Sequence, residues 1–165
     1  MATAQTAGPP LIDSQTLPCG DAIDNRPPPR DMQVVRGVVG LPASPRADAL
    51  QTGLTGEPFP ALRLFAKTGL VIKTGVKFEL LVSSLTGNRV GIAWGDAPST
   101  PSHRVVVNCP DNGGTGWLAY PGGYWLDHPA CTPLTVRLGM KEESVAIGLG
   151  TPCPGQRPPQ GASDR

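Results

Sequence analysis

The feature that most constrains this chain is a series of short apolar runs separated by glycine and proline. The 165 residues include 21 glycines and 20 prolines. Between Met32 and Leu149 most apolar runs alternate with polar residues, as in Phe78, Leu80 and Val82. Alternation with a period of two is typical of half-buried β-strands, and no segment shows ten residues of helical periodicity. The pattern therefore predicts an all-β protein.

Short strands at nearly even spacing with Gly/Pro turns are typical of sandwiches and small barrels. We expect an immunoglobulin-like β-sandwich of about eight short strands, with a jelly roll as the alternative. Residues 34–39 are the first predicted strand. Residues 116–120 and 124–126 flank Pro121-Gly122-Gly123 and predict a hairpin or sharp corner.

Prolines concentrate at both ends of the chain, where periodicity is weak. Residues 1–30 are predicted to form an extended N-terminal arm and residues 31–153 the sandwich domain. Residues 154–165 are predicted to be a disordered Pro-rich tail.

Charge is sparse and balanced, with 16% charged residues and a formal net charge of +1. A nucleic-acid partner is not expected, because no cluster of Lys and Arg could neutralise phosphates. No run of 18 apolar residues exists, so no membrane span is expected in this chain.

Four cysteines, Cys19, Cys109, Cys131 and Cys153, stand far apart, and none forms a Cys-x-x-Cys pair. Such a set predicts two structural disulfides rather than a metal site. Three connectivities are open, and position along the chain slightly favours Cys109–Cys131 with Cys19–Cys153. No cofactor or metal is predicted.

Disulfides persist in oxidising compartments, which predicts an extracytoplasmic or cell-surface location. The N-terminus has no basic and apolar leader, so an export segment would have to lie outside this sequence. The alternative is a cytoplasmic protein whose thiols stay reduced.

Catalytic motifs are lacking, so we expect a protein that is not an enzyme. His103 and His128 are predicted to be ordinary surface residues. Asp127 and His128 are neighbours and would point to opposite faces if the chain there were extended. The alternative function is a glycosidase-type hydrolase that uses loop carboxylates around Asp111 and Asp127.

Aromatic residues make up only 5% of the chain, yet four of them, Trp117, Tyr120, Tyr124 and Trp125, fall within nine residues. Together they predict a surface that binds a cell-envelope polysaccharide or a protein partner. The competing interpretation places Trp94 and either Trp117 or Trp125 in the core beside a disulfide.

Several short motifs follow one another along the chain: Cys19-Gly20-Asp21, Gly91-Ile92-Ala93-Trp94-Gly95, Cys109-Pro110, the segment from Trp117 to Trp125, Cys131-Thr132-Pro133-Leu134-Thr135-Val136, Ile147-Gly148-Leu149-Gly150 and Cys153-Pro154-Gly155. Together they resemble a group of uncharacterised proteins of high-GC, actinobacterial-type bacteria. The resemblance covers most of residues 19–155. It implies an exported or membrane-anchored protein with a small cysteine-containing β-domain, and it implies no activity or site residues.

Overall fold

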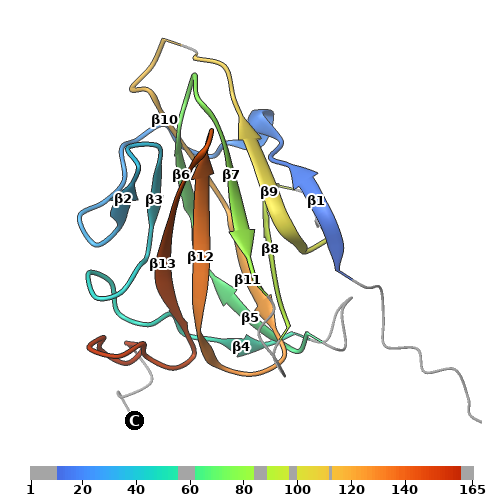
Figure 1. The fold of residues 1–165 in the computed structure, drawn as a ribbon, viewed down its shortest axis with the longest axis vertical. Helices are drawn as coiled ribbons and strands as arrows, with labels where there is room; N and C mark the ends of the chain where they lie inside the picture. The colour runs from blue at the N-terminus through green and yellow to red at the C-terminus, as the bar shows by residue number, and fades with distance from the viewer. Residues whose placement is uncertain (1–10, 56–61, 84–88, 97–99, 112, 161–165) are drawn as a thin grey trace, which may run out of the picture.

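A computed structural model describes residues 11–55, 62–83, 89–96, 100–111 and 113–160 of the chain. Two β-sheets pack face to face (Figure 1). The all-β sandwich predicted from the sequence is therefore confirmed, while its immunoglobulin-like arrangement stays a prediction. One short 3₁₀ turn, η1, spans Cys19–Asp21. No helix in the described ranges is long and apolar enough to cross a membrane.

The larger sheet has nine strands in the order β13-β12-β7-β9-β8-β11-β5-β4, and β1 pairs with β9 in parallel. Its strands, in chain order, are β1 (Ile12–Thr16), β4 (Gly53–Leu54), β5 (Leu64–Lys67), β7 (Lys77–Val82), β8 (Val90–Trp94), β9 (Ser102–Asn108), β11 (Gly122–Leu126), β12 (Ala130–Leu138) and β13 (Lys141–Leu149).

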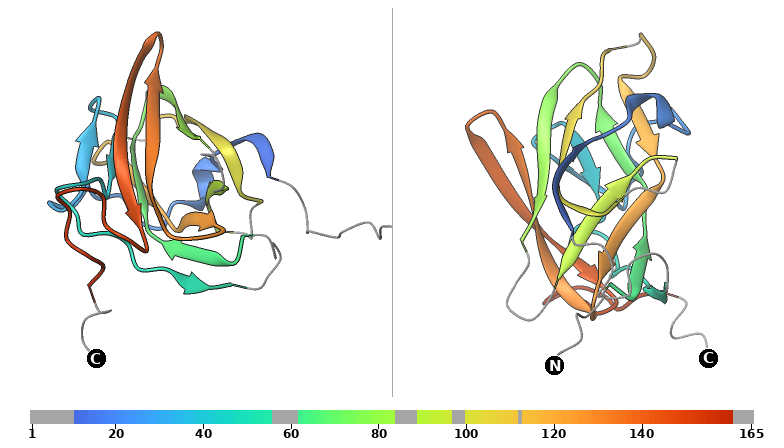
Figure 2. Two further views of the ribbon diagram at one scale, coloured as in Figure 1. Left: turned by 60° about the horizontal axis from the view of Figure 1, so that its bottom comes forward. Right: turned by 90° about the vertical axis from the view of Figure 1, so that its right-hand side faces the viewer.

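The smaller sheet has four strands in the order β10-β6-β3-β2. These strands are β2 (Gln33–Val35), β3 (Val39–Leu41), β6 (Leu70–Lys73) and β10 (Trp117–Tyr120). Figure 2 shows from two further directions how this sheet faces the larger one, with the β12–β13 hairpin at one edge.

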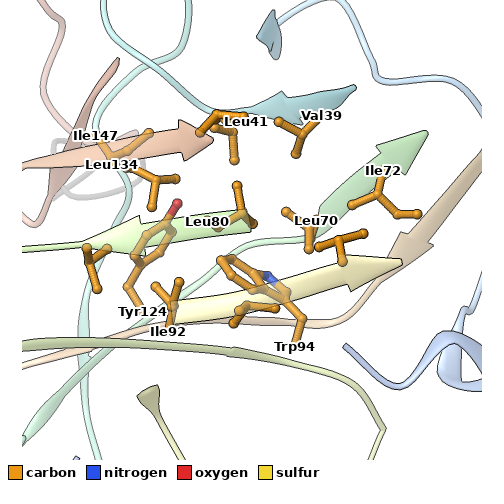
Figure 3. Close-up of a cluster of buried hydrophobic side chains, with 14 of the residues drawn as sticks. Val39, Leu41, Leu70, Ile72, Leu80, Ile92, Trp94, Tyr124, Leu134 and Ile147 are labelled. Atoms are coloured by element: carbon orange, nitrogen blue, oxygen red, sulfur yellow. The ribbon is translucent and has the colours of Figure 1, made fainter. Parts of the chain in front are cut away.

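The core lies between the two sheets and is built from the apolar members of the alternating runs. Phe78, Leu80 and Val82 in β7 are all buried, as the alternation predicts. Figure 3 shows side chains of both sheets meeting there, among them Leu41 and Ile72 from the smaller sheet. Burial of this continuous apolar layer is the main term that stabilises the fold.

The two sheets are joined at a corner, where the chain passes from one sheet to the other twice. β5 continues into β6 after Thr68 and Gly69, and β10 continues into β11 after Pro121. The bend is held by backbone hydrogen bonds from Thr68 N to Gly122 O (3.0 Å) and from Gly95 N to Pro121 O (2.8 Å). The corner predicted at Pro121-Gly122-Gly123 is thus present, as a turn between sheets.

The single strand predicted at residues 34–39 is wrong, because this run is a hairpin of β2 and β3. Arg36 and Gly37 both have positive φ, at 53° and 73°. Two successive residues of positive φ are typical of the type I′ turn, which reverses the chain between the two strands of a tight β-hairpin. Such splitting and bending of predicted runs explains why the structure has more strands than the eight expected.

The N-terminal arm contributes to the sheet in its described part, residues 11–30. β1 lies parallel to β9, and Leu17 N donates to Val106 O (2.9 Å). Further along, Asp24 forms a bridge with Ala119 of β10. Residues 1–10 of the predicted arm lie outside the described residues.

The disulfide pairing favoured by position along the chain is wrong. The bridges are Cys19–Cys109 and Cys131–Cys153. β1 runs parallel to β9, so the residues after each strand, including Cys19 and Cys109, arrive at the same end. Cys131 opposes Gly148 in the β12–β13 hairpin, and the chain turns back after β13 to bring Cys153 beside it.

Residues 154–160, predicted to belong to a disordered tail, pack against the 47–49 loop. The Gln156 side chain is buried; its Nε2 donates to Ala47 O (2.6 Å), and its Oε1 accepts from Cys153 N (2.9 Å). Ala49 N donates to Arg157 O (3.0 Å). Residues 161–165 of the predicted tail lie outside the described residues.

Candidate functional site

The four aromatic residues predicted to bind a ligand divide between the inside and the outside of the sandwich. Tyr120 and Tyr124 are fully buried, whereas Trp117 and Trp125 are partly exposed. The structure therefore corrects the predicted set, because a buried tyrosine offers no ring face to a ligand at the surface. The division follows the alternation of β10 and β11, in which neighbouring side chains point to opposite faces.

Tyr120 lies next to a disulfide, a place that the competing interpretation gave to Trp94 and either Trp117 or Trp125. The Tyr120 hydroxyl donates to Cys19 O (2.9 Å) and lies 3.6 Å from Cys109 Sγ. Burial raises the pKa of Tyr120, and the negative charge of Asp21 raises it further. This tyrosine is therefore a structural link between the disulfide and β10.

Trp94 is a core residue, as the competing interpretation expected. Its indole Nε1 donates to Thr68 O (3.0 Å) at the corner. Its ring meets the ring of Tyr124 edge to face, at 5.6 Å between centroids. Burial raises the pKa of Tyr124 strongly. Among the described residues its hydroxyl has no hydrogen-bond partner.

Two glycines at the corner allow the strands to approach closely. A Cβ on Gly122 would collide with Ala93 O, and a Cβ on Gly123 would collide with Ala66 O. Both residues also have positive φ, at 153° and 157°. Only glycine therefore fits at positions 122 and 123. The next residues of β11, Tyr124 and Trp125, pair with β5 on one side and with β8 on the other.

Trp117 lies on the outer face of the smaller sheet. Its register partner in β6 is Lys73, and Lys73 Nζ lies 5.3 Å from the centroid of the Trp117 ring. This distance is within the range of a cation–π contact, so one face of the ring is already occupied.

Trp125 lies on the outer face of the larger sheet and has an aromatic neighbour. Its register partner in β5 is Phe65, also partly exposed, and the two ring centroids are 4.5 Å apart with 42° between the planes. We call Phe65 and Trp125 the ring pair. Sequence alternation pointed Phe65 away from the core, but nothing in the sequence indicated that β5 and β11 are neighbours.

A surface cavity of about 360 Å³ opens beside the ring pair. It is lined by Gln51, Thr52, Gly53, Phe65 and Lys67. Gly53 is the register partner of Phe65 in β4, and a Cβ there would meet nothing within 4 Å. The face of β4 beside the Phe65 ring is therefore open, and amide, hydroxyl and ammonium groups surround it.

The two carboxylates proposed for a hydrolase do not meet. Asp127 follows β11, whose last residue Leu126 pairs with Val90, while Asp111 follows β9, whose last residue pairs with Lys77. β9 runs about 20 Å from its pairing with β8 to its end, at about 3.3 Å per residue. The two carboxylates thus lie at opposite ends of the sandwich, too far apart to act as a glycosidase pair.

Asp127 and His128 contact each other, contrary to the expectation that they point apart. His128 Nδ1 lies 3.0 Å from Asp127 Oδ1. The chain bends at these residues instead of continuing as a strand, which turns both side chains to one side. Asp127 Oδ1 also accepts from Arg89 N (3.1 Å), so this carboxylate closes the end of β11 against β8.

Four charged groups of the larger sheet's outer face are paired across strands. Arg137 contacts Glu142 (2.7 Å) and Glu79 (3.4 Å), and Arg104 contacts Glu79 (3.6 Å). The Glu142 carboxylate raises the pKa of Arg137. Within the described ranges, no group of three or more His, Cys, Asp or Glu residues could hold a metal ion.

The ring pair with its cavity is thus the candidate site. It combines two rings accessible from outside with polar groups of several kinds. No protein-family model, curated protein or solved structure matches this chain.

Proposed function

We propose that this protein is a non-catalytic β-sandwich module that binds a polysaccharide of the cell envelope. The observation that carries the proposal is the ring pair, two neighbouring and partly exposed aromatic rings beside a polar cavity. Aromatic rings stack on the apolar faces of sugars, and nearby amide and hydroxyl groups bond to sugar hydroxyls. Gln51 and Thr52 supply those groups at the cavity wall.

The two disulfides support an extracytoplasmic setting for this function. Both bridges are structural, and such bonds persist where the environment is oxidising. The resemblance to exported proteins of high-GC bacteria points to the same compartment. The cell envelope is therefore the source of ligands to test first.

The test is co-sedimentation of the purified protein with insoluble peptidoglycan and arabinan-type polysaccharides. Trp125→Ala is the test variant, and Trp117→Ala is the matched control, because both tryptophans are partly exposed on an outer face. We expect the wild type and Trp117→Ala to be retained. Trp125→Ala should lose at least tenfold in affinity, which corresponds to about 1.4 kcal/mol.

A cooperative thermal unfolding transition like that of the wild type would show that Trp125→Ala is folded. Equal retention of all three proteins would remove the ring pair as the contact. Absence of retention for the wild type on any polysaccharide would overturn the proposal and leave a protein partner as the ligand of the ring pair.

A further inference from the structure

A second, larger cavity of about 550 Å³ lies next to the cavity beside the ring pair. Gln51 lines both cavities, and Lys67 of the first is followed in the chain by Thr68 of the second. The two cavities are therefore neighbours along residues 46–53, and we call them together the groove. Each part falls within the ≈ 300–1,000 Å³ typical of a small-molecule site.

The walls of the larger cavity carry charges that cancel. Two arginines, Arg46 and Arg157, and two aspartates, Asp31 and Asp48, line it. Arg157 Nε and Asp48 Oδ1 form an ion pair at 2.6 Å. Such a surface offers many hydrogen-bonding groups and no net charge, which suits an uncharged, hydroxyl-rich ligand better than a polyanion.

One wall of the groove is held in place before any ligand arrives. Gln156 fixes Ala47 through its side-chain hydrogen bond, and Ala49 N is bonded to Arg157 O. The Cys131–Cys153 bridge ties the same C-terminal segment to β12. A fixed wall lowers the conformational entropy that binding would otherwise cost.

We infer that the ligand is a linear chain of several neutral sugar units that lies along this whole groove. One unit stacks on the ring pair, the chain passes Gln51, and further units occupy the cavity between Arg46 and Asp48. The inference rests on the proposed function and adds the length and charge of the ligand. It makes Arg46 a contact for the distant units and Gln51 a contact between the two cavities.

The test uses oligosaccharides of two to eight units, prepared from the polysaccharide that the wild type retains, in isothermal titration calorimetry. We expect the affinity of the wild type to rise at least tenfold with length and then to level off. Arg46→Ala should lower the affinity for the longest oligosaccharide at least fivefold and leave that for the shortest unchanged, whereas Gln51→Ala should lower the affinity at every length. Trp125→Ala should weaken binding at every length.

Arg26→Ala is the control, because Arg26 is exposed and pairs only locally with Asp24. It should bind all lengths like the wild type. Affinity independent of length, with Arg46→Ala unchanged and Trp125→Ala impaired, would overturn the inference while the proposed function stands. A charged polysaccharide that binds more tightly than its neutral counterpart would overturn the assignment of a neutral ligand.

Discussion

The inner and outer faces of residues 117–125 place similar rings in opposite environments. Tyr120 and Tyr124 point inward and are completely buried, and Trp117 and Trp125 point outward and stay partly exposed. The inner rings hold the fold together, whereas the Trp125 ring stays accessible at the surface, where we propose that it binds a ligand. A cluster of aromatic residues in a sequence is thus not one functional unit; strand geometry divides it.

The inner face itself contains two unlike tyrosines. The Tyr120 hydroxyl is bonded to Cys19 O, and in the described part of the chain the Tyr124 hydroxyl is unpartnered. Burial of an unbonded hydroxyl destabilises a fold, whereas a buried bonded one stabilises it. The two residues therefore contribute with opposite signs through the same functional group.

The largest effect on stability is expected from Gly123→Ala, which disrupts the corner between the two sheets. Its Cβ would collide with backbone of β5, so we expect a loss of about 3 kcal/mol or more in the free energy of unfolding. Urea denaturation measures it. Gly53→Ala, whose Cβ enters open space, should change stability by less than about 1 kcal/mol; similar effects of both variants would contradict the role of the corner.

The next effect concerns pH, because the pKa of both inner tyrosines is raised in the folded state. Above pH ~10 the unfolded chain loses these protons while the native protein keeps them, so stability falls as pH rises. Tyr120 and Tyr124 are the only tyrosines in the chain. A group that keeps its proton only in the folded state adds up to about 1.4 kcal/mol per pH unit to the slope, and Tyr124 has the larger shift. Urea denaturation between pH 9 and 11 measures it.

The Tyr120→Phe/Tyr124→Phe double variant is the control for that slope and should lose most of it. An identical alkaline slope in the double variant would show that other groups cause the loss of stability. Phenolate absorbance in the native protein should also rise at higher pH than in the denatured protein.

Single phenylalanine substitutions sharpen the contrast between the two tyrosines. Tyr120→Phe should lower the free energy of unfolding by about 1 kcal/mol, because Cys19 O loses its donor. Tyr124→Phe should leave it unchanged or raise it by about 1 kcal/mol, since an unbonded hydroxyl is removed. Thermal unfolding of both variants measures the difference in stability. A loss of stability in Tyr124→Phe equal to that in Tyr120→Phe would mean that the Tyr124 hydroxyl has a hydrogen-bond partner.

The smallest effect distinguishes the two outer tryptophans. A double-mutant cycle between Lys73→Ala and Trp117→Ala should give a coupling energy of about 0.5 kcal/mol, as expected for an exposed cation–π contact. The same cycle with Trp125→Ala should give a value near zero. Coupling of Lys73 to Trp125 instead would contradict the separation of the two outer faces.

Local patterns in the sequence were enough to predict strands and the side to which their residues point. The alternation in β7 identified one face, with Phe78 and Val82, as core. Pro121-Gly122-Gly123 was predicted to be a hairpin or a sharp corner, and the structure has the corner. These features depend on residues close together in the chain, where period and turn chemistry apply directly.

Long-range pairing could not be predicted in the same way. The Cys19–Cys109 bridge depends on β1 lying parallel to β9, and no local pattern in the N-terminal arm indicates that partner. The candidate site depends on β5 lying beside β11, which pairs Phe65 with Trp125. The groove adds Arg46 and Arg157, residues brought together only by the fold.

The separation of faces has a consequence for protein engineering. Positions 65, 67 and 125 point outward from strands whose inward residues form the core, so their identity can be randomised while the hydrophobic packing stays intact. A display library restricted to those three positions would explore new specificities on an unaltered scaffold. The glycines at the corner and the two cystine bridges would have to be held constant in every clone.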